Sequence, residues 1–225
     1  MRAMKRLSVV GVGPGASDLL TLRALERVSE AEVLFYPVKR EGEKGLAFAA
    51  VEPHLPAGIK CVPLLFPMTL EGERLEEAWR DAADAILREP FERAVFVVLG
   101  DPTLYSTYFY VHPLLEGVEV ELVPGVSSIS ACCCALGESL AQGDGAVLIL
   151  SASHSLPEAI DERVSSVVLM KIPGDRGRQK ELVKRLREMG FSRIRFASRC
   201  MLEGQVVSES IPEGAPYLSM VIAKR

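Results

Sequence analysis

The sequence lacks long apolar runs. Its apolar stretches at 95–99, 146–150 and 167–170 are far shorter than the roughly 20 residues of a membrane-spanning helix. The basic N-terminus is followed by an apolar stretch, 7–12, which glycines interrupt and which is too short for the core of a signal peptide. We therefore expect a cytoplasmic protein with no membrane partner.

The charge and the cysteine content of the chain argue against further classes of protein. The chain has 225 residues, and its 26 Lys and Arg against 30 Asp and Glu give a formal net charge of −4, which argues against a general nucleic-acid binder. The five cysteines are odd in number and Cys132–Cys134 are adjacent, which does not fit a disulfide framework. Neighbouring helical residues diverge by about 100°, so these three cannot share a metal ion. The three histidines are scattered, and we expect no metal site.

The sequence does contain an alternation of strand and helix patterns. Strands are predicted at 7–10, 33–36, 60–65, 95–99 and 118–123, the last alternating apolar and acidic residues like an edge strand. The pattern restarts near residue 124, with strands at 146–150, 165–172 and 194–198. This predicts an α/β fold of two domains, 1–123 and 124–225, with a cleft between them.

Three local details complete this prediction. Asp18 is expected to cap the first helix, whose apolar positions begin at Leu19 and Leu22. An amphipathic helix is expected at 179–189, ended by Gly190. Segments 205–209 and 217–223 are expected to form a closing antiparallel pair.

The turn after the buried strand 95–99 is a candidate binding wall. Gly100-Asp101-Pro102 ends this strand abruptly, because Pro102 has no backbone donor and Gly100 tolerates a positive φ. Small molecules bind outside the carboxyl ends of the strands in open α/β sheets. The polar residues of this turn therefore predict a site, with an ordinary capped turn as the alternative. The stretch Pro124–Ser128 offers hydroxyls and backbone donors at the start of the next helix.

The loop Gly11–Ala16 matches the G-x-G-x-x-A form of the dinucleotide fingerprint. The fingerprint also needs an acidic residue at the end of the second strand. Here that strand runs into Pro37-Val38-Lys39, without a carboxylate. NAD binding is therefore the weaker interpretation of this loop.

Three motifs taken together resemble the tetrapyrrole (corrin/porphyrin) methylases: Gly11–Gly15, Gly100–Pro102 and Pro124–Ser128, in this order, with Val168–Lys171 and Ala197–Arg199 downstream. The resemblance covers essentially the whole chain. Phe35–Lys39, Glu41–Lys44 and Gly100–Thr107 look like the branch that methylates carbon 20 of precorrin-2 or cobalt-precorrin-2 in cobalamin synthesis. The resemblance implies a homodimer of two-domain α/β subunits, with S-adenosylmethionine in the interdomain cleft.

The resemblance also implies which residues contact the methyl donor: Leu99, Gly100, Asp101, Thr103, Ser106, Ser127, Ser128, Leu169, Met170, Ala197, Ser198, Tyr217 and Leu218. A sulfonium methyl is already activated, so the main task is to hold it in line with the attacking carbon. That carbon must then lose a proton. Asp101, Tyr105 and His112 are candidate bases because they lie near the central turn.

The tetrapyrrole substrate carries carboxylates around its rim. The basic residues expected on loops near the site are Lys39, Arg40, Lys44, Arg176, Arg178 and Arg199. Each can pair with a carboxylate, as a point charge for lysine or in bidentate fashion for arginine.

Three other functions stay open at this point. The first is a related methylase that acts at another ring carbon or on a diphthine intermediate. The second is an NAD-dependent oxidoreductase that uses Gly11–Ala16, and the third is a binding module without catalysis. The residues do not decide whether cobalt is already in the ring.

Overall fold

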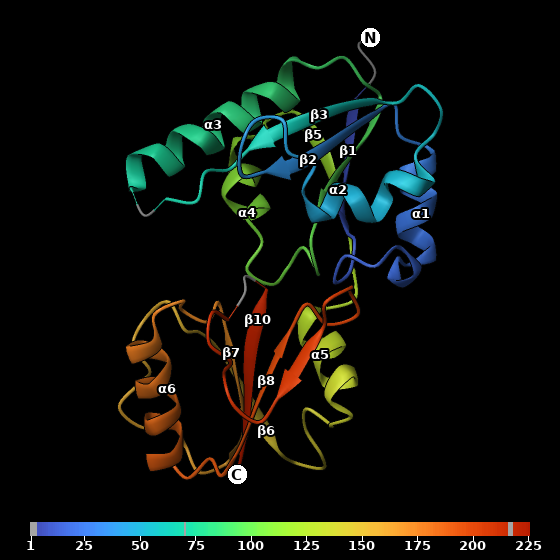
Figure 1. The fold of residues 1–225 in the computed structure, drawn as a ribbon. Helices are drawn as coiled ribbons and strands as arrows, with labels where there is room; N and C mark the ends of the chain where they lie inside the picture. The colour runs from blue at the N-terminus through green and yellow to red at the C-terminus, as the bar shows by residue number, and fades with distance from the viewer. Residues whose placement is uncertain (1–3, 70, 216–217) are drawn as a thin grey trace. The chain divides into compact units, whose positions relative to one another are not determined.

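The computed structural model describes residues 4–69, 71–215 and 218–225 (Figure 1). The chain divides into two compact units, Met1–Ser127 and Ser128–Arg225. The division falls after Ser127, whereas the sequence pattern restarts after Val123. Each unit contains one five-stranded sheet with helices packed against it.

The first unit is built on a parallel sheet with the strand order β3-β2-β4-β1-β5. Its strands are β1 (Lys5–Gly11), β2 (Val33–Val38), β3 (Lys60–Leu65), β4 (Arg93–Val98) and β5 (Val118–Val123). The strand predicted to be buried at 95–99 is buried on both faces, because Val95 and Phe96 are each 1% exposed and belong to the cores on opposite faces. Strand β5 lies at the edge, as its alternation predicts.

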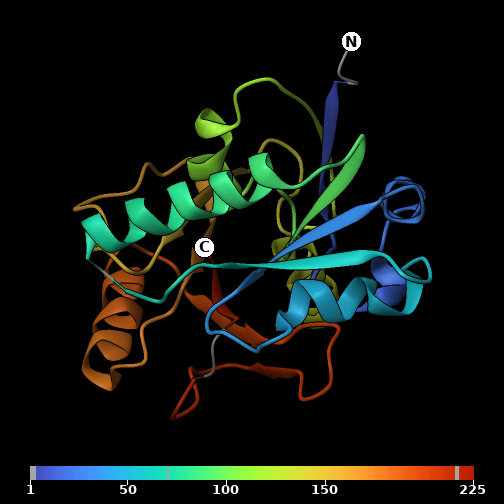
Figure 2. The same cartoon turned by 90° about the horizontal axis from the view of Figure 1, so that it is seen from above.

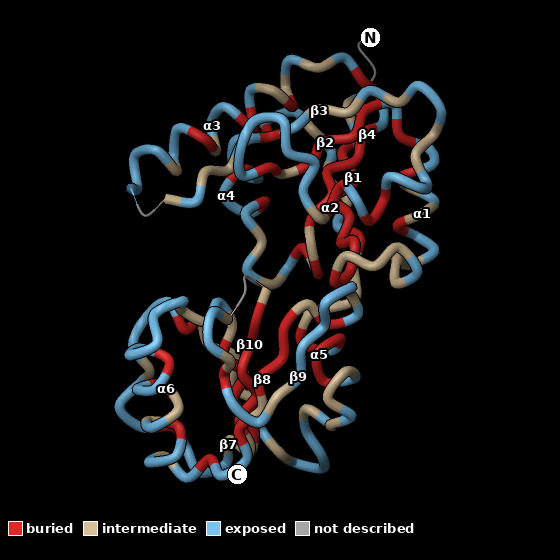
Figure 3. The backbone as a smooth tube through the Cα atoms, in the orientation of Figure 1, coloured by how far each residue is buried: buried red, intermediate tan, exposed pale blue. Residues whose placement is uncertain are grey.

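Helices cover both faces of this sheet (Figure 2). Helices α1 (Leu22–Ser29) and α2 (Gly45–Val51) pack in the core that contains Val95. The 3-10 turn η2 (Glu52–His54) directly follows α2 in the chain. Helices α3 (Gly72–Arg88) and α4 (Tyr108–Val111), the latter continued by η3 (His112–Leu114), pack in the core that contains Phe96. The backbone of β1, β2 and β4 is accordingly the buried centre of this unit (Figure 3).

The first helix begins later than predicted. Residues Ser17–Leu19 form a 3-10 turn, η1, and Leu20 is extended, so the helix cannot continue from Asp18. Thr21 caps α1 instead, its hydroxyl oxygen accepting a hydrogen bond from the Ala24 N–H at 3.1 Å. Leu22, expected on the buried face, is 86% exposed.

The second unit has a mixed sheet with the strand order β6-β7-β10-β8-β9. Its strands are β6 (Ala146–Ser151), β7 (Val164–Met170), β8 (Arg193–Ser198), β9 (Val206–Ser208) and β10 (Ser219–Lys224). Helix α6 (Arg176–Glu188) packs in the core that contains Val167 and Leu169, while α5 (Ser128–Leu136) packs against β8 (Figure 1).

The predicted closing pair of strands is wrong. Strand β10 lies between β7 and β8 and is antiparallel to both, while β9 pairs with β8 at the edge of the sheet. The physical reason is composition: Met220–Ala223 is apolar and buried, which suits a central strand, whereas Val206 and Val207 in β9 are well exposed at the edge. Within the part of the chain that the structure describes, no helix is both long enough and apolar enough to cross a membrane.

Candidate functional site

Three strand ends meet through glycine in the first sheet. Gly11 ends β1, Gly100 follows β4, and Gly125 follows β5. A Cβ atom on Gly125 would lie 2.4 Å from the Gly100 carbonyl oxygen and 2.6 Å from the Gly11 carbonyl carbon and oxygen. Gly13 and Gly100 exchange two backbone hydrogen bonds, of 3.2 and 2.7 Å. The three backbones therefore pack closer than side chains permit, and this fixes the turn after β4.

The same packing gives the glycine loop a role other than dinucleotide binding. In the dinucleotide fold a helix begins directly after the loop, with its N-terminus facing the pyrophosphate. Here α1 begins only at Leu22, and Gly11 faces the backbones of Gly125 and Gly100. The geometry does not favour the NAD interpretation.

Asp101 joins the two polar turns of the first unit. Its Oδ1 accepts hydrogen bonds from the Thr103 N–H at 2.9 Å and from the Thr103 hydroxyl, and its Oδ2 accepts from the Gly125 N–H at 3.1 Å. Burial acts to raise the pKa of Asp101, but these hydrogen bonds outweigh it and hold the pKa below its usual value. The carboxylate is thus ionised at neutral pH and both of its oxygens are engaged, which suits a positioning residue better than a proton acceptor.

The other donor-binding candidates of this unit lie along the same turn. Leu99 packs into the core beneath it. Gly100 has a φ of +76°, and nothing lies within 4 Å of the place where its Cβ would be, so this side of the turn is open. The Ser106 hydroxyl accepts a hydrogen bond from the Tyr108 N–H at 3.3 Å at the entry to α4. Ser127 ends the first unit and Ser128 begins α5.

The two remaining candidate bases differ in their surroundings. Tyr105 adopts a left-handed φ of 52° and its side chain is exposed. His112 lies on η3, and its Nδ1 is 2.6 Å from the hydroxyl of the fully buried Tyr108. Burial raises the pKa of Tyr108, so the phenol keeps its proton, and the direction of its hydrogen bond with Nδ1 depends on the tautomer of His112. This hydrogen bond engages Nδ1 of His112 with a side chain of the core.

The candidates of the second unit come together by strand register. Met220 pairs with Met170 on one side and with Ala197 on the other, and Ser219 pairs with Ser198. The Leu218 carbonyl oxygen accepts a hydrogen bond from the Arg199 N–H at 3.2 Å. The carboxyl ends of β7 and β8 and the start of β10 thus form one edge. Leu169 lies one residue further into the sheet, and Tyr217 lies outside the described residues.

Two features mark this edge as more than an ordinary strand end. The Ser198 hydroxyl is buried and has no hydrogen-bond partner among the described residues. Four residues other than glycine adopt a positive φ there, namely Lys171, Arg199, Met201 and Leu218. Strained backbone of this kind concentrates at binding sites, where the surrounding structure compensates for it. Lys171 was expected only as the end of the motif Val168–Lys171, and Met201 was not expected at this edge, because neither residue type signals a left-handed conformation.

The basic residues of the first unit divide into two groups. Lys39 and Arg40 directly follow β2 and line a hollow of about 430 Å³ together with Glu43 and Met68. Lys44 is instead ion-paired with Glu52, and this hydrogen-bonded partner raises its pKa. Lys39 and Arg40 thus line one hollow, while Lys44 pairs with a carboxylate of its own chain.

Each of the three arginines that the sequence predicts to bind substrate in the second unit donates a hydrogen bond to a backbone carbonyl. Arg176 donates to the Ile211 oxygen at 2.6 Å, Arg178 to the Ser153 oxygen at 3.0 Å, and Arg199 to the Glu203 oxygen at 2.9 Å. Arg176 and Arg178 lie on the first turn of α6, whereas Arg199 follows β8. A carbonyl leaves the positive charge uncompensated, so a carboxylate partner stays possible for each of them.

No metal centre accompanies these edges. Among residues 4–69, 71–215 and 218–225, no cluster of three or more His, Cys, Asp and Glu is arranged to hold a metal ion. Cys132 and Cys133 are buried on α5, while Cys134 is exposed, so the three adjacent thiols point to different surroundings.

A family model described as Tetrapyrrole (Corrin/Porphyrin) Methylases matches residues 6–210. The chain belongs to this family. This tetrapyrrole methylase is 36% identical to the Methanocaldococcus jannaschii protein named "Probable cobalt-precorrin-2 C(20)-methyltransferase", over 100% of this chain and 98% of that one. It is 29% identical to a Sinorhizobium precorrin-2 C(20)-methyltransferase, over 96% and 94% of the two chains.

The fold of this methylase is also that of solved relatives. Thermus thermophilus uroporphyrin-III C-methyl transferase, crystallised with S-adenosyl homocysteine, superposes with a TM-score of 0.63 at 23% identity and covers 98% of this chain and 97% of that chain. The α/β fold that the sequence predicts is thereby confirmed.

Proposed function

We propose that this methylase transfers a methyl group from S-adenosylmethionine to carbon 20 of cobalt-precorrin-2 in cobalamin biosynthesis. The observation that carries the proposal is the 36% identity, over the full length of both chains, to a relative that bears this name. The precorrin-2 enzyme is less similar, at 29%, and for this reason we propose the cobalt form as substrate.

The residues of the two edges fit a sulfonium donor. The open side of Gly100 leaves room for a ligand against the backbone, and the Ser198 hydroxyl, which has no partner among the residues that the structure describes, offers a hydrogen bond to a ligand. The donor supplies an activated methyl group when bound. The solved relative that was crystallised with S-adenosyl homocysteine supports this choice of donor. We assign Leu99, Gly100, Asp101, Thr103, Ser106, Ser127 and Ser128 in the first unit, with Leu169, Met170, Ala197, Ser198, Tyr217 and Leu218 in the second, to donor binding.

The chain contributes mainly by positioning. Asp101 holds the turn after β4 against Gly125, and the glycine contacts leave that turn little freedom to move. Holding a methyl group in line with its acceptor supplies several kcal/mol, about 7–11 in favourable cases, of the barrier. Because Asp101 and His112 are engaged as described, we assign the proton that leaves the ring carbon to Tyr105 or to water.

The hollow beside Lys39 and Arg40 is the proposed site for carboxylates of the macrocycle. It lies where β2 ends, and the parallel sheet directs the ends of β1, β4 and β5 to the same edge. Charge-assisted hydrogen bonds of this kind also fix the orientation of a ligand.

A homodimer is the proposed assembly, supported by exposed aromatic side chains on and around α4. Tyr105, Phe109, Tyr110 and Leu114 are 38–57% exposed within ten residues, and Tyr110 stacks on Trp79 at 4.2 Å. Clusters of exposed apolar side chains mark interaction surfaces. Light scattering of the purified chain tests this: the wild type should have the mass of two chains, and Tyr110→Glu should reduce it to one. We also propose the cytoplasm as location, which cell fractionation tests.

The test of the reaction uses methyl-labelled S-adenosylmethionine with either precorrin-2 or cobalt-precorrin-2. We expect label in the cobalt form, and NMR of the product should place it at carbon 20. Label at another carbon would assign a related methylase reaction instead. No transfer to either macrocycle, in a chain that binds S-adenosylhomocysteine, would refute the proposed substrate.

A further inference from the structure

Helix α6 is strongly basic in an otherwise acidic chain. Its 13 residues include six Lys and Arg and only two Glu, whereas the whole chain has a net charge of −4. Such a charge run is often only a solvated face, so it needs a second feature to indicate a ligand.

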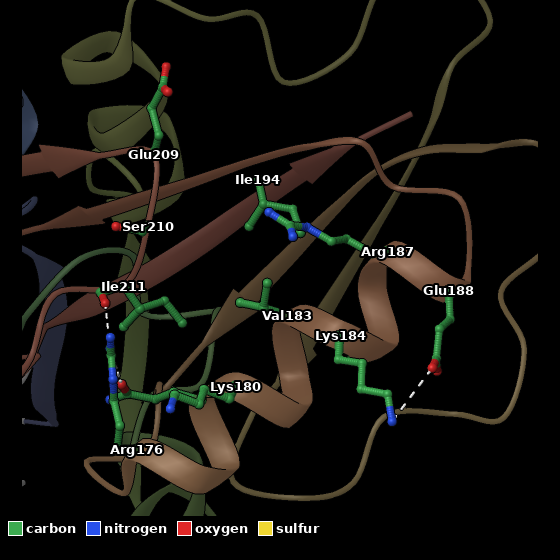
Figure 4. Close-up of a pocket in the computed structure, with 11 residues that line it drawn as sticks. Arg176, Lys180, Val183, Lys184, Arg187, Glu188, Ile194, Glu209, Ser210 and Ile211 are labelled. Carbon is green, nitrogen blue, oxygen red and sulfur yellow. Dashed lines mark hydrogen bonds and ion pairs between the residues drawn. The ribbon is translucent and has the colours of Figure 1, made fainter.

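That second feature is a hollow of about 410 Å³ beside the helix, bounded on its other side by the segment 209–211 (Figure 4). Val183, Ile194 and Ile211 contribute apolar side chains to it, and Ile194 and Ile211 are 8% and 5% exposed. Arg176 closes one end by donating to the Ile211 carbonyl oxygen at 2.6 Å. The groove is thus a built feature with an apolar floor.

The charges around the groove are unbalanced. Lys180 and Arg187 line it, and neither has an ion pair or a hydrogen bond from its side chain within the described part of the chain. The two carboxylates that also line it are already paired, Glu188 with Lys184 at 3.8 Å and Glu209 with Arg195 at 3.4 Å. Positive charge is therefore left over in the groove.

The spacing of these cations defines the ligand class. With a rise of about 1.5 Å per residue, Lys180 lies about 6 Å along the helix from Arg176, and Arg187 about 10 Å beyond Lys180. Arg176, Lys180 and Arg187 lie on the same face of α6 as Val183, because residues four, seven and eleven positions after Arg176 share one face of a helix. The matching ligand has a flat apolar body with several carboxylates along one edge.

We propose that the α6 groove is a second binding site for the carboxylate edge of a tetrapyrrole, in addition to the hollow beside Lys39 and Arg40. This inference rests on the proposed function for the identity of the macrocycle. An acidic protein segment shares the charge, and the test below separates it from a macrocycle. The groove holds substrate before transfer, or product after it.

The test counts binding sites on the full chain saturated with S-adenosylhomocysteine. Uroporphyrin I, a stable macrocycle with carboxylates around its rim, is titrated by fluorescence in 50 mM and 500 mM salt. We expect two macrocycles per chain in the wild type, and one for the double variant Lys180→Glu with Arg187→Glu. Binding to the lost site should fall at least tenfold, and in the wild type it should weaken at high salt.

The matched control is Arg80→Glu with Arg88→Glu on the exposed side of α3. It changes the net charge by the same amount and removes only exposed ion pairs, which contribute little to stability. It should retain two sites. Calorimetry with S-adenosylhomocysteine should give wild-type affinity for both double variants, which shows that they fold.

Three results would overturn the proposal: one macrocycle per wild-type chain, equal losses in the control, or a groove that binds polyglutamate but no macrocycle. The methyl-transfer assay is read separately. A wild-type chain that binds two macrocycles but methylates neither form of precorrin-2 would refute the proposed function and leave the groove in place.

Discussion

Replacing Gly125 by alanine tests the central geometric claim about the first unit. The new methyl group would lie 2.4 Å from the Gly100 carbonyl oxygen, and ordinary van der Waals contact begins near 3.4 Å, so one backbone must move by about 1 Å. Both neighbours are backbone atoms of other strand ends, so no side chain can rotate away. The same movement lengthens the hydrogen bond of 3.1 Å from the Gly125 N–H to Asp101.

The expected cost follows from these two effects. Overpacking of this kind costs about 1–3 kcal/mol, and a weakened hydrogen bond to a charged group costs up to about 1.5–3 kcal/mol, so we expect a loss of roughly 2–4 kcal/mol. For a chain of this size each kcal/mol lowers the melting temperature by about 2–4 °C. The affinity for S-adenosylhomocysteine should fall at least tenfold, because the turn that is proposed to bind it is displaced.

Calorimetric melting and ligand titration measure the two effects. The matched control is Gly72→Ala at the first residue of α3, where nothing lies within 4 Å of the new Cβ and φ is not left-handed. It should be neutral or stabilising by about 0.4–1 kcal/mol. A Gly125→Ala chain with the wild-type melting temperature and wild-type affinity would refute the argument that backbone contact positions the turn.

Three further predictions concern single side chains. Asp101→Asn should lower the affinity for S-adenosylhomocysteine. It should also make the free energy of unfolding depend less on pH in the acid range. The pKa of Asp101 is lower in the folded chain than in the unfolded chain, so the stabilisation by its carboxylate is present above the unfolded pKa and is lost as pH falls through the folded pKa. His112→Ala should lower the stability by about 1 kcal/mol through the lost hydrogen bond to Tyr108, with the rate of methyl transfer within threefold of wild type. Lys39→Ala should raise the KM for the macrocycle about tenfold, whereas Lys44→Ala should leave it unchanged.

Each of these predictions has a contrary result. An Asp101→Asn chain with the wild-type acid denaturation profile would show that the carboxylate is not held by its hydrogen bonds. A hundredfold loss of rate in His112→Ala would make His112 the base. An equal rise of KM at Lys39 and Lys44 would place both residues, rather than one, at the entrance for the macrocycle.

Several elements were predictable because their signal is local. The edge strand Lys60–Leu65 has the predicted bounds. The strand β4 was predicted within two residues, since a run of β-branched and aromatic residues ended by glycine encodes a buried strand directly. The motifs around Gly100 and Gly125 were singled out for the same reason. The donor-binding and substrate-binding roles of individual residues are still predictions.

Other features depend on residues far apart in the chain. The sequence by itself determined the α/β alternation, the restart after the fifth strand and the polar turns at the strand ends, because hydrophobic period and turn chemistry act within a few residues. Only the tertiary structure decided that β10 lies between β7 and β8, that Glu52 engages Lys44, and that Gly11 packs on Gly125. Strand order, ion pairs and backbone contacts depend on which surfaces meet after folding, and no local pattern records that.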